Sequence, residues 1–283
     1  MKIVDATKGI ENVFLNGNFN LSLWEKYINT IHPKLKALCL EDMNRTIQTG
    51  LFSFENDYLP ILNDVILNNK ARKETVKNFH SITKTLGQEI ISKFGKTVDV
   101  EIVLYLGLCN GAGWVEEIDG KTYVLLGIEK IIELKWYDLK TMKGLIYHEL
   151  GHAYHNEYTK LDQTFDNNKD KFLWQLFTEG VATFFEQTLE GNYNQYHEDQ
   201  DSWKEWCDLN YDKIKQDFNQ DLQTMTFENQ RYFGDWVSYN GKGNVGYYLG
   251  TKFIHYLNEK YEFEDILSFD INKVKKEYKE FID

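Results

Sequence analysis

Apolar residues recur at helical spacing through the first third of the chain, between about residues 21 and 94. Val76, Phe79 and Ile82, for example, fall three residues apart, which places them on one face of a helix. The pattern therefore predicts a helical N-terminal region over residues 1–97.

A strand-like pattern follows. Residues 98–106 form a β-branched run, and residues 121–128 repeat that character directly after Asp119-Gly120. Asp-Gly between two such segments is a strong signal for a hairpin turn. We expect residues 112–117 and 121–128 to pair as antiparallel strands with residues 98–106 beside them, as a small, mostly antiparallel sheet.

The remainder of the chain is again helical in pattern. Asp138 is a plausible N-cap for a helix over residues 139–157, and Gly191 is a plausible end for a second helix over residues 171–189. Three further helices are expected at 201–218, 245–261 and 271–281. The fold class is α+β and mainly helical, with residues 98–283 as a second region in one compact unit. No Gly/Ser-rich or Pro-rich linker separates the two parts.

The helix predicted at 139–157 contains His148-Glu149-Leu150-Gly151-His152, which matches H-E-x-x-H. Residues four apart share one face of a helix, so both imidazoles can reach one metal ion, and Glu149 lies beside it. The bland alternative is a pair of surface histidines. The apolar residues around the motif argue against that alternative, because a buried helix needs partners for its polar side chains.

A tetrahedral zinc site with one open position needs a third protein ligand. Glu179 lies in the middle of an apolar helical stretch on the C-terminal side of the motif, where an unpaired carboxylate would be costly. We therefore predict Glu179 as the third ligand, the alternative being a solvent-facing glutamate. Gly180 and Ala182 would let this helix approach the first one closely.

His148-Glu149-x-x-His152 followed by Glu179-Gly180-x-Ala182 resembles the gluzincin metallopeptidases, and the E-G-x-A form is similar to bacterial predicted zinc-dependent proteases. The resemblance covers roughly residues 98–256. It implies a zincin-like fold, one Zn²⁺ per chain, hydrolysis of peptide bonds, and a sheet edge that aligns an extended substrate. The exopeptidase signature Gly-x-Met-Glu-Asn is absent, and Thr183 stands where thermolysin-like members have an aspartate.

The mechanism that this resemblance implies gives Glu149 the role of general base toward the water that the metal activates. Glu186, which lies along the same helical face as Glu179, is a candidate acceptor for the second ring nitrogen of a histidine ligand, the alternative being a solvated glutamate. Thr183, at the position of the family's aspartate, is the other candidate for this role. Tyr247 is the candidate donor to the oxyanion, with Tyr248 and His255 as alternatives.

Composition and charge limit the classes of binding partner that we expect. The chain has 44 acidic and 32 basic residues, a net charge of -12, so no basic surface for nucleic acid is expected. Its three cysteines show no paired spacing, and no export signal or membrane-length apolar run is visible. The expected partner is a peptide or protein substrate and the expected location is the cytoplasm, while the oligomeric state is left open.

Two other functions remain open from the sequence. The zinc site could belong to a peptidase that cleaves one specific protein, or it could stabilise a non-catalytic or regulatory protein-binding module. A purely structural zinc site would hold four protein ligands and no general base. Three ligands with Glu149 beside them favour catalysis. A metal-free peptide-binding module is the least favoured reading.

Overall fold

The computed structural model describes residues 1–159, 163–234 and 236–282. The chain forms two compact units, Met1–Glu149 and Leu150–Asp283. Helix α7 (Leu139–Asn156) runs without a break through the point at which they divide. The predicted division into residues 1–97 and 98–283 stays a prediction.

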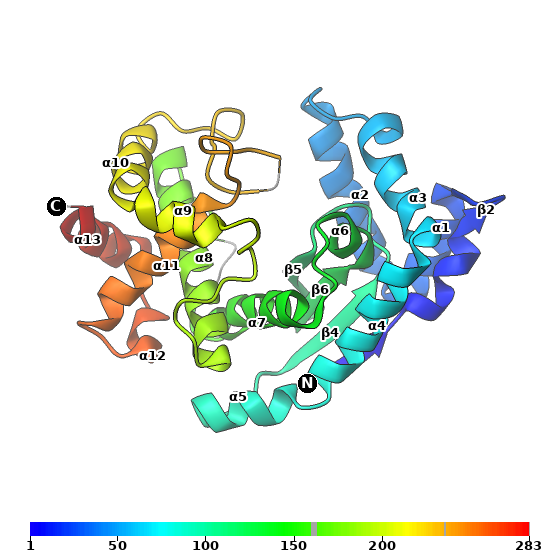
Figure 1. Cartoon of the computed structure of the whole chain (residues 1–283), viewed down its shortest axis with the longest axis horizontal. Helices are drawn as coiled ribbons and strands as arrows, with labels where there is room; N and C mark the ends of the chain where they lie inside the picture. The colour runs from blue at the N-terminus through cyan, green and yellow to red at the C-terminus, as the bar shows by residue number, and fades with distance from the viewer. Residues whose placement is uncertain (160–162, 235, 283) are drawn as a thin grey trace. The chain divides into compact units, whose positions relative to one another are not determined.

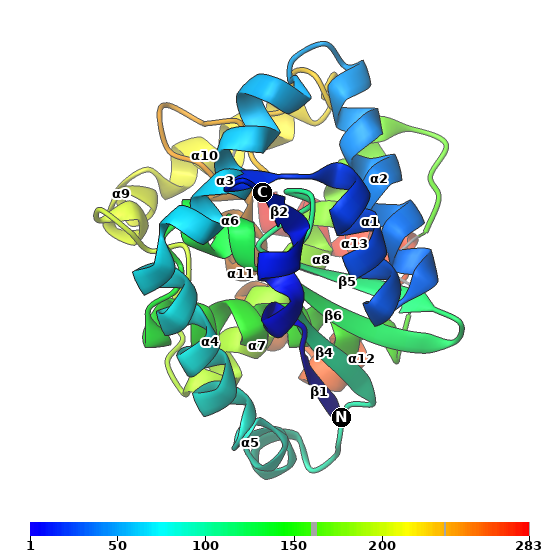
Figure 2. The ribbon, with the colours of Figure 1, turned by 90° about the vertical axis from the view of Figure 1, so that its right-hand side faces the viewer.

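The first unit contains a four-stranded sheet, visible edge to edge in Figure 2. Its strands lie in the order β1 (Lys2–Asp5), β4 (Val100–Tyr105), β6 (Lys121–Gly127) and β5 (Gly113–Ile118). β1 and β6 run parallel to β4, and β5 runs antiparallel to β6. The expectation of a mostly antiparallel sheet is wrong in this respect, because two of its three pairings are parallel.

The burial and charge of the strands agree with their places in the sheet. Residues 123–127 of β6 are buried, which suits an inner strand covered on both faces. β5 carries Glu116 and Glu117, and charged residues suit an edge. The predicted hairpin is confirmed, because Asp119 and Gly120 both have positive φ, 54° and 73°, as a two-residue turn requires. β6 therefore lies between β4 and its own hairpin partner.

Helices pack around this sheet, as the periodicity predicts. They are η1 (Thr7–Val13), α1 (Leu21–Ile31), α2 (Pro33–Gln48), η2 (Phe54–Tyr58), α3 (Leu59–Leu67), α4 (Asn69–Thr83), α5 (Leu86–Phe94) and α6 (Ile128–Glu133), with a short hairpin of β2 (Phe14–Leu15) and β3 (Asn18–Phe19). Two buried side chains of helix α1 form hydrogen bonds with the backbone just after β4. Trp24 Nε1 donates to the carbonyl of Leu106 at 2.8 Å, and the Leu106 N–H donates to the Tyr27 hydroxyl at 2.9 Å.

The second unit is helical. Beyond α7 it contains α8 (Asn168–Glu190), α9 (Trp203–Leu209), α10 (Tyr211–Asp221), α11 (Val245–Asn258), α12 (Phe263–Ile266) and α13 (Ile271–Ile282). Residues 201–218, expected as one helix, form two, because the chain leaves helical geometry at Asn210. The Asn210 side-chain amide donates to the Trp206 carbonyl at 2.8 Å, which satisfies a carbonyl at the end of α9.

Helices α8 and α11 lie side by side at the centre of this unit (Figure 1). Their backbones touch, since a Cβ placed on Gly180 would lie 2.3 Å from the Gly250 carbonyl oxygen. Across the described residues, no helix has the length and apolar character needed to cross a membrane. The predicted α+β fold class, mainly helical with a small sheet before the H-E-x-x-H helix, is confirmed.

Candidate metal centre

Helix α7 begins where the sequence predicts. The Asp138 carboxylate accepts the backbone N–H groups of Lys140 and Thr141 at 3.0 and 3.1 Å, which satisfies two donors that the helix itself cannot use. The helix then continues through the whole H-E-x-x-H segment. His148 and His152 therefore lie one turn apart on one face.

Glu179 comes from α8, which begins at its N-cap Asn167 and ends at Gly191 in left-handed conformation. Glu179 Oε2 lies 3.1 Å from His152 Nε2, and each of these two side chains is 14% exposed. His148, His152 and Glu179 each offer one ligand atom, and all three atoms lie within 4.8 Å of one another. The predicted donors are thus brought together, with partial access from solvent.

These residues fit a zinc ion. Two donors bound to one tetrahedral zinc at their usual bond lengths lie about 3.4 Å apart, close to the separation between His152 and Glu179. Two imidazoles and one carboxylate leave the fourth position open, which is the arrangement of catalytic rather than structural zinc sites.

Small residues explain how α8 comes so close to the second half of α7. A Cβ on Gly151 would lie 2.7 Å from Ala182 Cα and 3.0 Å from Phe185 Cβ. The two helices therefore cross with their backbones nearly in contact, because neither Gly151 nor Ala182 interposes a long side chain. This close crossing lets the short carboxylate of Glu179 reach the imidazole of His152.

Glu149 is buried in the first unit, with 6% of its surface exposed. Its side chain lies against Gly113, the first residue of the edge strand β5, where an added Cβ would come within 2.5 Å of both Cγ and Oε1. A residue larger than glycine at this position would displace the carboxylate. The general-base candidate is therefore packed against the beginning of the edge strand.

Glu186 lies in a buried group of side chains, of which the sequence pattern indicates Glu186 and His148 but not His197. It is fully buried on α8, and its Oε2 lies 2.8 Å from His197 Nδ1. His148, Glu186 and His197 also form a group whose ligand atoms lie within 4.8 Å of one another. Burial raises the pKa of the Glu186 carboxyl well above its ordinary value, and the charge of Glu190 adds to this.

His197 carried no sequence signal, because it lies in the connection after α8, outside any helical period. Its Nε2 lies 3.5 Å from Glu198 Oε1, so the imidazole has a carboxylate on either side. Thr183 is also buried, and its hydroxyl donates to the Glu179 carbonyl at 3.0 Å. Thr183 thus bonds within its own helix at the position where thermolysin-like members carry an aspartate.

The three candidate oxyanion donors on α11 have different surroundings. The Tyr248 hydroxyl donates to Asp208 at 2.8 Å, and His255 Nε2 lies 2.9 Å from the side-chain oxygen of Gln187. Tyr247 is half-buried with its ring against Phe233, three residues before the glycine that touches α8. Tyr248 and His255 are thus engaged in contacts with other helices, and the choice of Tyr247 stays a prediction from the sequence.

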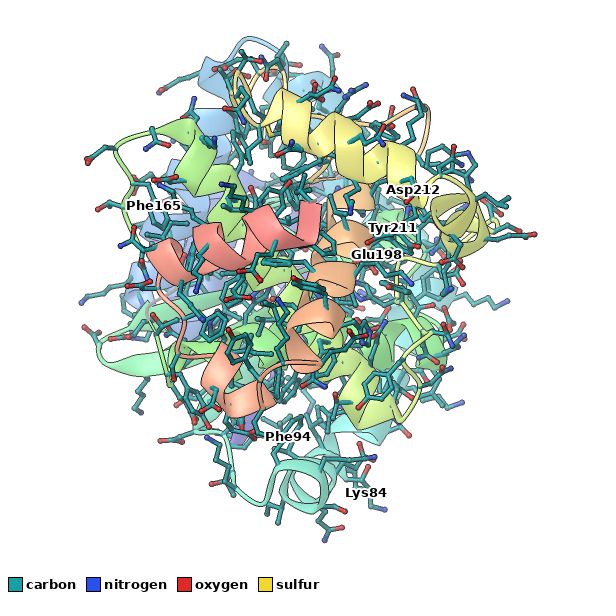
Figure 3. All side chains as sticks on the ribbon, turned by 90° about the vertical axis from the view of Figure 1, so that its left-hand side faces the viewer. Lys84, Phe94, Phe165, Glu198, Tyr211 and Asp212 are labelled. Atoms are coloured by element: carbon teal, nitrogen blue, oxygen red, sulfur yellow. The ribbon has the colours of Figure 1, made fainter. Side chains whose placement is uncertain are left out.

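A separate surface groove of about 550 Å³ lies among α9, α10, α11 and α13. Figure 3 shows α10, α11 and α13 from the outside and labels Tyr211, which lines the groove at the beginning of α10. Tyr248 and His255 also line it, whereas none of the predicted metal ligands does. The groove is therefore distinct from the metal centre.

The α+β fold and the donor set of two histidines and a glutamate define a candidate zinc protein with an open coordination position. Residues 58–272 match the model of a protein family described as "Putative zinc dependent peptidase (DUF5700)". The match covers most of the chain and includes every residue of the donor set, so the chain belongs to this family. Neither the curated proteins nor the solved structures contain a match.

Proposed function

We propose that this chain is a metallopeptidase of the gluzincin type, in which His148, His152 and Glu179 hold one Zn²⁺ and Glu149 is the general base. The observation that carries the proposal is the convergence of three donors, with Glu149 next to a ligand on the same helix. Membership of the zinc-dependent peptidase family supports the reaction class.

Zn²⁺ in this donor set would supply Lewis acidity toward a carbonyl oxygen and would acidify a water molecule. Glu149 would take the proton of that water as its oxygen bonds to the scissile carbonyl carbon. The same carboxyl group would then give the proton to the leaving nitrogen as the C–N bond breaks. Burial of Glu149 keeps it in a low-dielectric setting, where its charge acts strongly on groups nearby.

The edge strand supports an extended peptide as substrate. β5 has β6 on one side only, and among the described residues no strand pairs with its other side. The backbone N–H and C=O groups along this edge could pair with a peptide by strand addition, beginning beside Gly113 where Glu149 lies. Tyr247 is our candidate for the oxyanion donor, and a cytoplasmic location stays a prediction.

The first experiment measures zinc content and cleavage of a mixed peptide library by the wild type, Glu149→Gln and the control Glu157→Gln. Glu157 is exposed just beyond the end of α7, so its substitution leaves the site unchanged. We expect one zinc in all three proteins. We expect cleavage by the wild type and the control, and a loss of about 10²–10⁴-fold in Glu149→Gln.

Each other outcome selects a different function. One zinc without cleavage by any of the three proteins would favour a narrow protein target or a zinc-stabilised binding module. Cleavage by Glu149→Gln at the wild-type rate would remove Glu149 from the mechanism. A wild type that binds no zinc would refute the proposal.

A further inference from the structure

The loop between β4 and β5, residues 107–112, has an unusual backbone. Cys109 has a φ of 58°, in the left-handed region that residues with a side chain rarely adopt. Such a conformation persists only where the surroundings hold it in place. The loop leads directly to Gly113, the residue that packs against Glu149. The contacts that fix this loop therefore act, together with the pairing of Gly113 with Leu126 of β6, on the wall against which the proposed general base lies.

Glu129 of helix α6 is the central contact of the loop. Its Oε2 accepts the Gly107 N–H at 2.9 Å, and its Oε1 accepts the Cys109 N–H at 3.0 Å. The carboxylate is almost fully buried, at 1% exposure, and it fits only because residue 107 has no side chain: a Cβ on Gly107 would lie 2.5 Å from Oε1. Both of its oxygens thus bind the loop backbone.

Asn110 holds the loop to helix α2. Its side-chain amide donates to the Cys39 carbonyl at 3.0 Å and to Asp42 Oδ2 at 2.9 Å, while its Oδ1 accepts the Leu108 N–H at 3.1 Å. The loop is therefore fastened to two helices. Glu129 of α6 holds its strained residue Cys109, and Asn110 holds it to α2.

The charge of Glu129 is costly in this environment. Burial raises the pKa of its carboxyl to about 7, although the N–H groups of Gly107 and Cys109 and the charge of Lys130 act in the opposite direction. The other titratable groups that face it, Tyr27, Tyr105 and Cys39, stay neutral, because burial raises the pKa of each. Lys130 is the nearby cation.

We propose that Glu129 is a positioning residue, whose carboxylate fixes the β4–β5 loop and thereby keeps Gly113 against Glu149. The effect on catalysis rests on the function proposed above, whereas the effect on the loop does not. An ionised carboxylate offers an acceptor oxygen to each N–H, and protonation converts one oxygen into a hydroxyl. The N–H groups of Gly107 and Cys109 lower the pKa of this buried carboxyl, so by linkage they bind its ionised form more strongly than its protonated form. While the carboxyl stays buried, the loop is therefore held more firmly above about pH 7 than below it.

The test uses Glu129→Gln, which keeps the size of the side chain but turns an NH₂ group toward one of the two N–H donors. The control is Glu133→Gln, at the end of the same helix, where the carboxylate pairs with Lys130 near the surface. The first readout is the rate at which a thiol reagent modifies Cys109, located by peptide mapping. Cys109 is half-buried, whereas Cys39 and Cys207 are buried and serve as internal references.

We expect Glu129→Gln to be modified at Cys109 about tenfold faster than the wild type at pH 8, because one charge-assisted hydrogen bond is lost. We expect the control to match the wild type. In the wild type, the rate per thiolate should rise as the pH falls below 7, and this measurement needs no variant to fold. The second readout is the pH profile of peptide cleavage. An acid limb near pH 7 in the wild type should be absent in Glu129→Gln, whose kcat should lie below that of the wild type above pH 7.

Equal Cys109 rates in the wild type and Glu129→Gln, with no pH dependence per thiolate, would overturn the proposal. Faster modification with unchanged kcat and an unchanged pH profile would overturn its catalytic part. If no protein cleaves peptides, the function proposed above fails, and the Cys109 rates still decide whether Glu129 holds the loop.

Discussion

Replacing Gly180 by alanine tests whether the close crossing of α8 and α11 sets the stability of the second unit. Gly180 follows the predicted ligand Glu179. A Cβ at this position would lie 2.3 Å from the oxygen and 2.4 Å from the carbon of the Gly250 carbonyl, whereas ordinary van der Waals contact begins at 3.4 Å. Because the obstacle is backbone, no rotation of a side chain can relieve it.

Two effects of opposite sign compete in Gly180→Ala. Alanine has a higher helix propensity than glycine by about 1 kcal/mol in a helix interior. Separating the helices by roughly 1 Å costs more, because overpacking a close-packed interior costs about 1–3 kcal/mol, and here backbone has to move. Because the obstacle is backbone, the clash outweighs the propensity, and we expect a net loss of up to about 2 kcal/mol of unfolding free energy.

The measurement is urea unfolding followed by circular dichroism, with Gly87→Ala as the matched control. Gly87 is also helical, near the beginning of α5, but an added Cβ there would have no atom within 4 Å. The same substitution should therefore be neutral or stabilising by up to about 1 kcal/mol. Because Glu179 is adjacent to the clash, zinc affinity should also fall in Gly180→Ala and stay unchanged in the control.

The reasoning fails if Gly180→Ala is as stable as Gly87→Ala. That result would mean that α8 and α11 can separate at negligible cost. A less stable Gly180→Ala with undiminished zinc affinity would instead mean that the crossing stabilises the unit without fixing Glu179.

Two further predictions concern pH and metal. Burial lowers the pKa of His255 to about 4, so the unfolded chain takes up this proton near pH 6.5 and the folded chain does so only near pH 4. The contribution of His255 to the unfolding free energy is therefore fully present above pH 6.5 and falls by about 3 kcal/mol between pH 6.5 and 4. His255→Asn should lose less unfolding free energy than the wild type between pH 7 and 4.5, whereas equal losses would contradict the assignment. Chelation should lower the melting temperature, and free zinc at 100 times its dissociation constant should restore about 2.7 kcal/mol, a response that we expect to be absent in His152→Ala.

Local signals in the sequence predicted the local features of the fold. Asp138 caps α7, Gly191 ends α8 in left-handed conformation, and the Asp119-Gly120 turn joins β5 to β6. In each case one or two residues carry the information, because capping and turn geometry depend on the neighbouring backbone alone. H-E-x-x-H is likewise a spacing within one helix, so the sequence alone could place His148 and His152 on one helical face.

Features that depend on distant residues were not predictable from local patterns. The strand Lys2–Asp5 is too short to show a period, and it is fixed by its parallel pairing with β4 almost a hundred residues later. His197 has no periodic context, and its contact with Glu186 depends on how the connection after α8 folds back. The Glu129 contacts likewise join α6 to the loop after β4. Such pairings arise from tertiary packing.

The Glu-Gly-x-Ala segment acquires a physical meaning from the two close crossings. Gly180 and Ala182 are two residues apart, so they point about 200° apart around α8. Gly180 meets Gly250 of α11, and Ala182 meets Gly151 of α7. Helix α8 is therefore held between two backbones on nearly opposite sides, and Glu179 projects about 60° from Ala182, toward the α7 side. The small residues thus act as spacers that fix the position of α8, which carries the proposed ligand Glu179. A ligand held in this way would have little freedom to reorient, which is what a preorganised site requires.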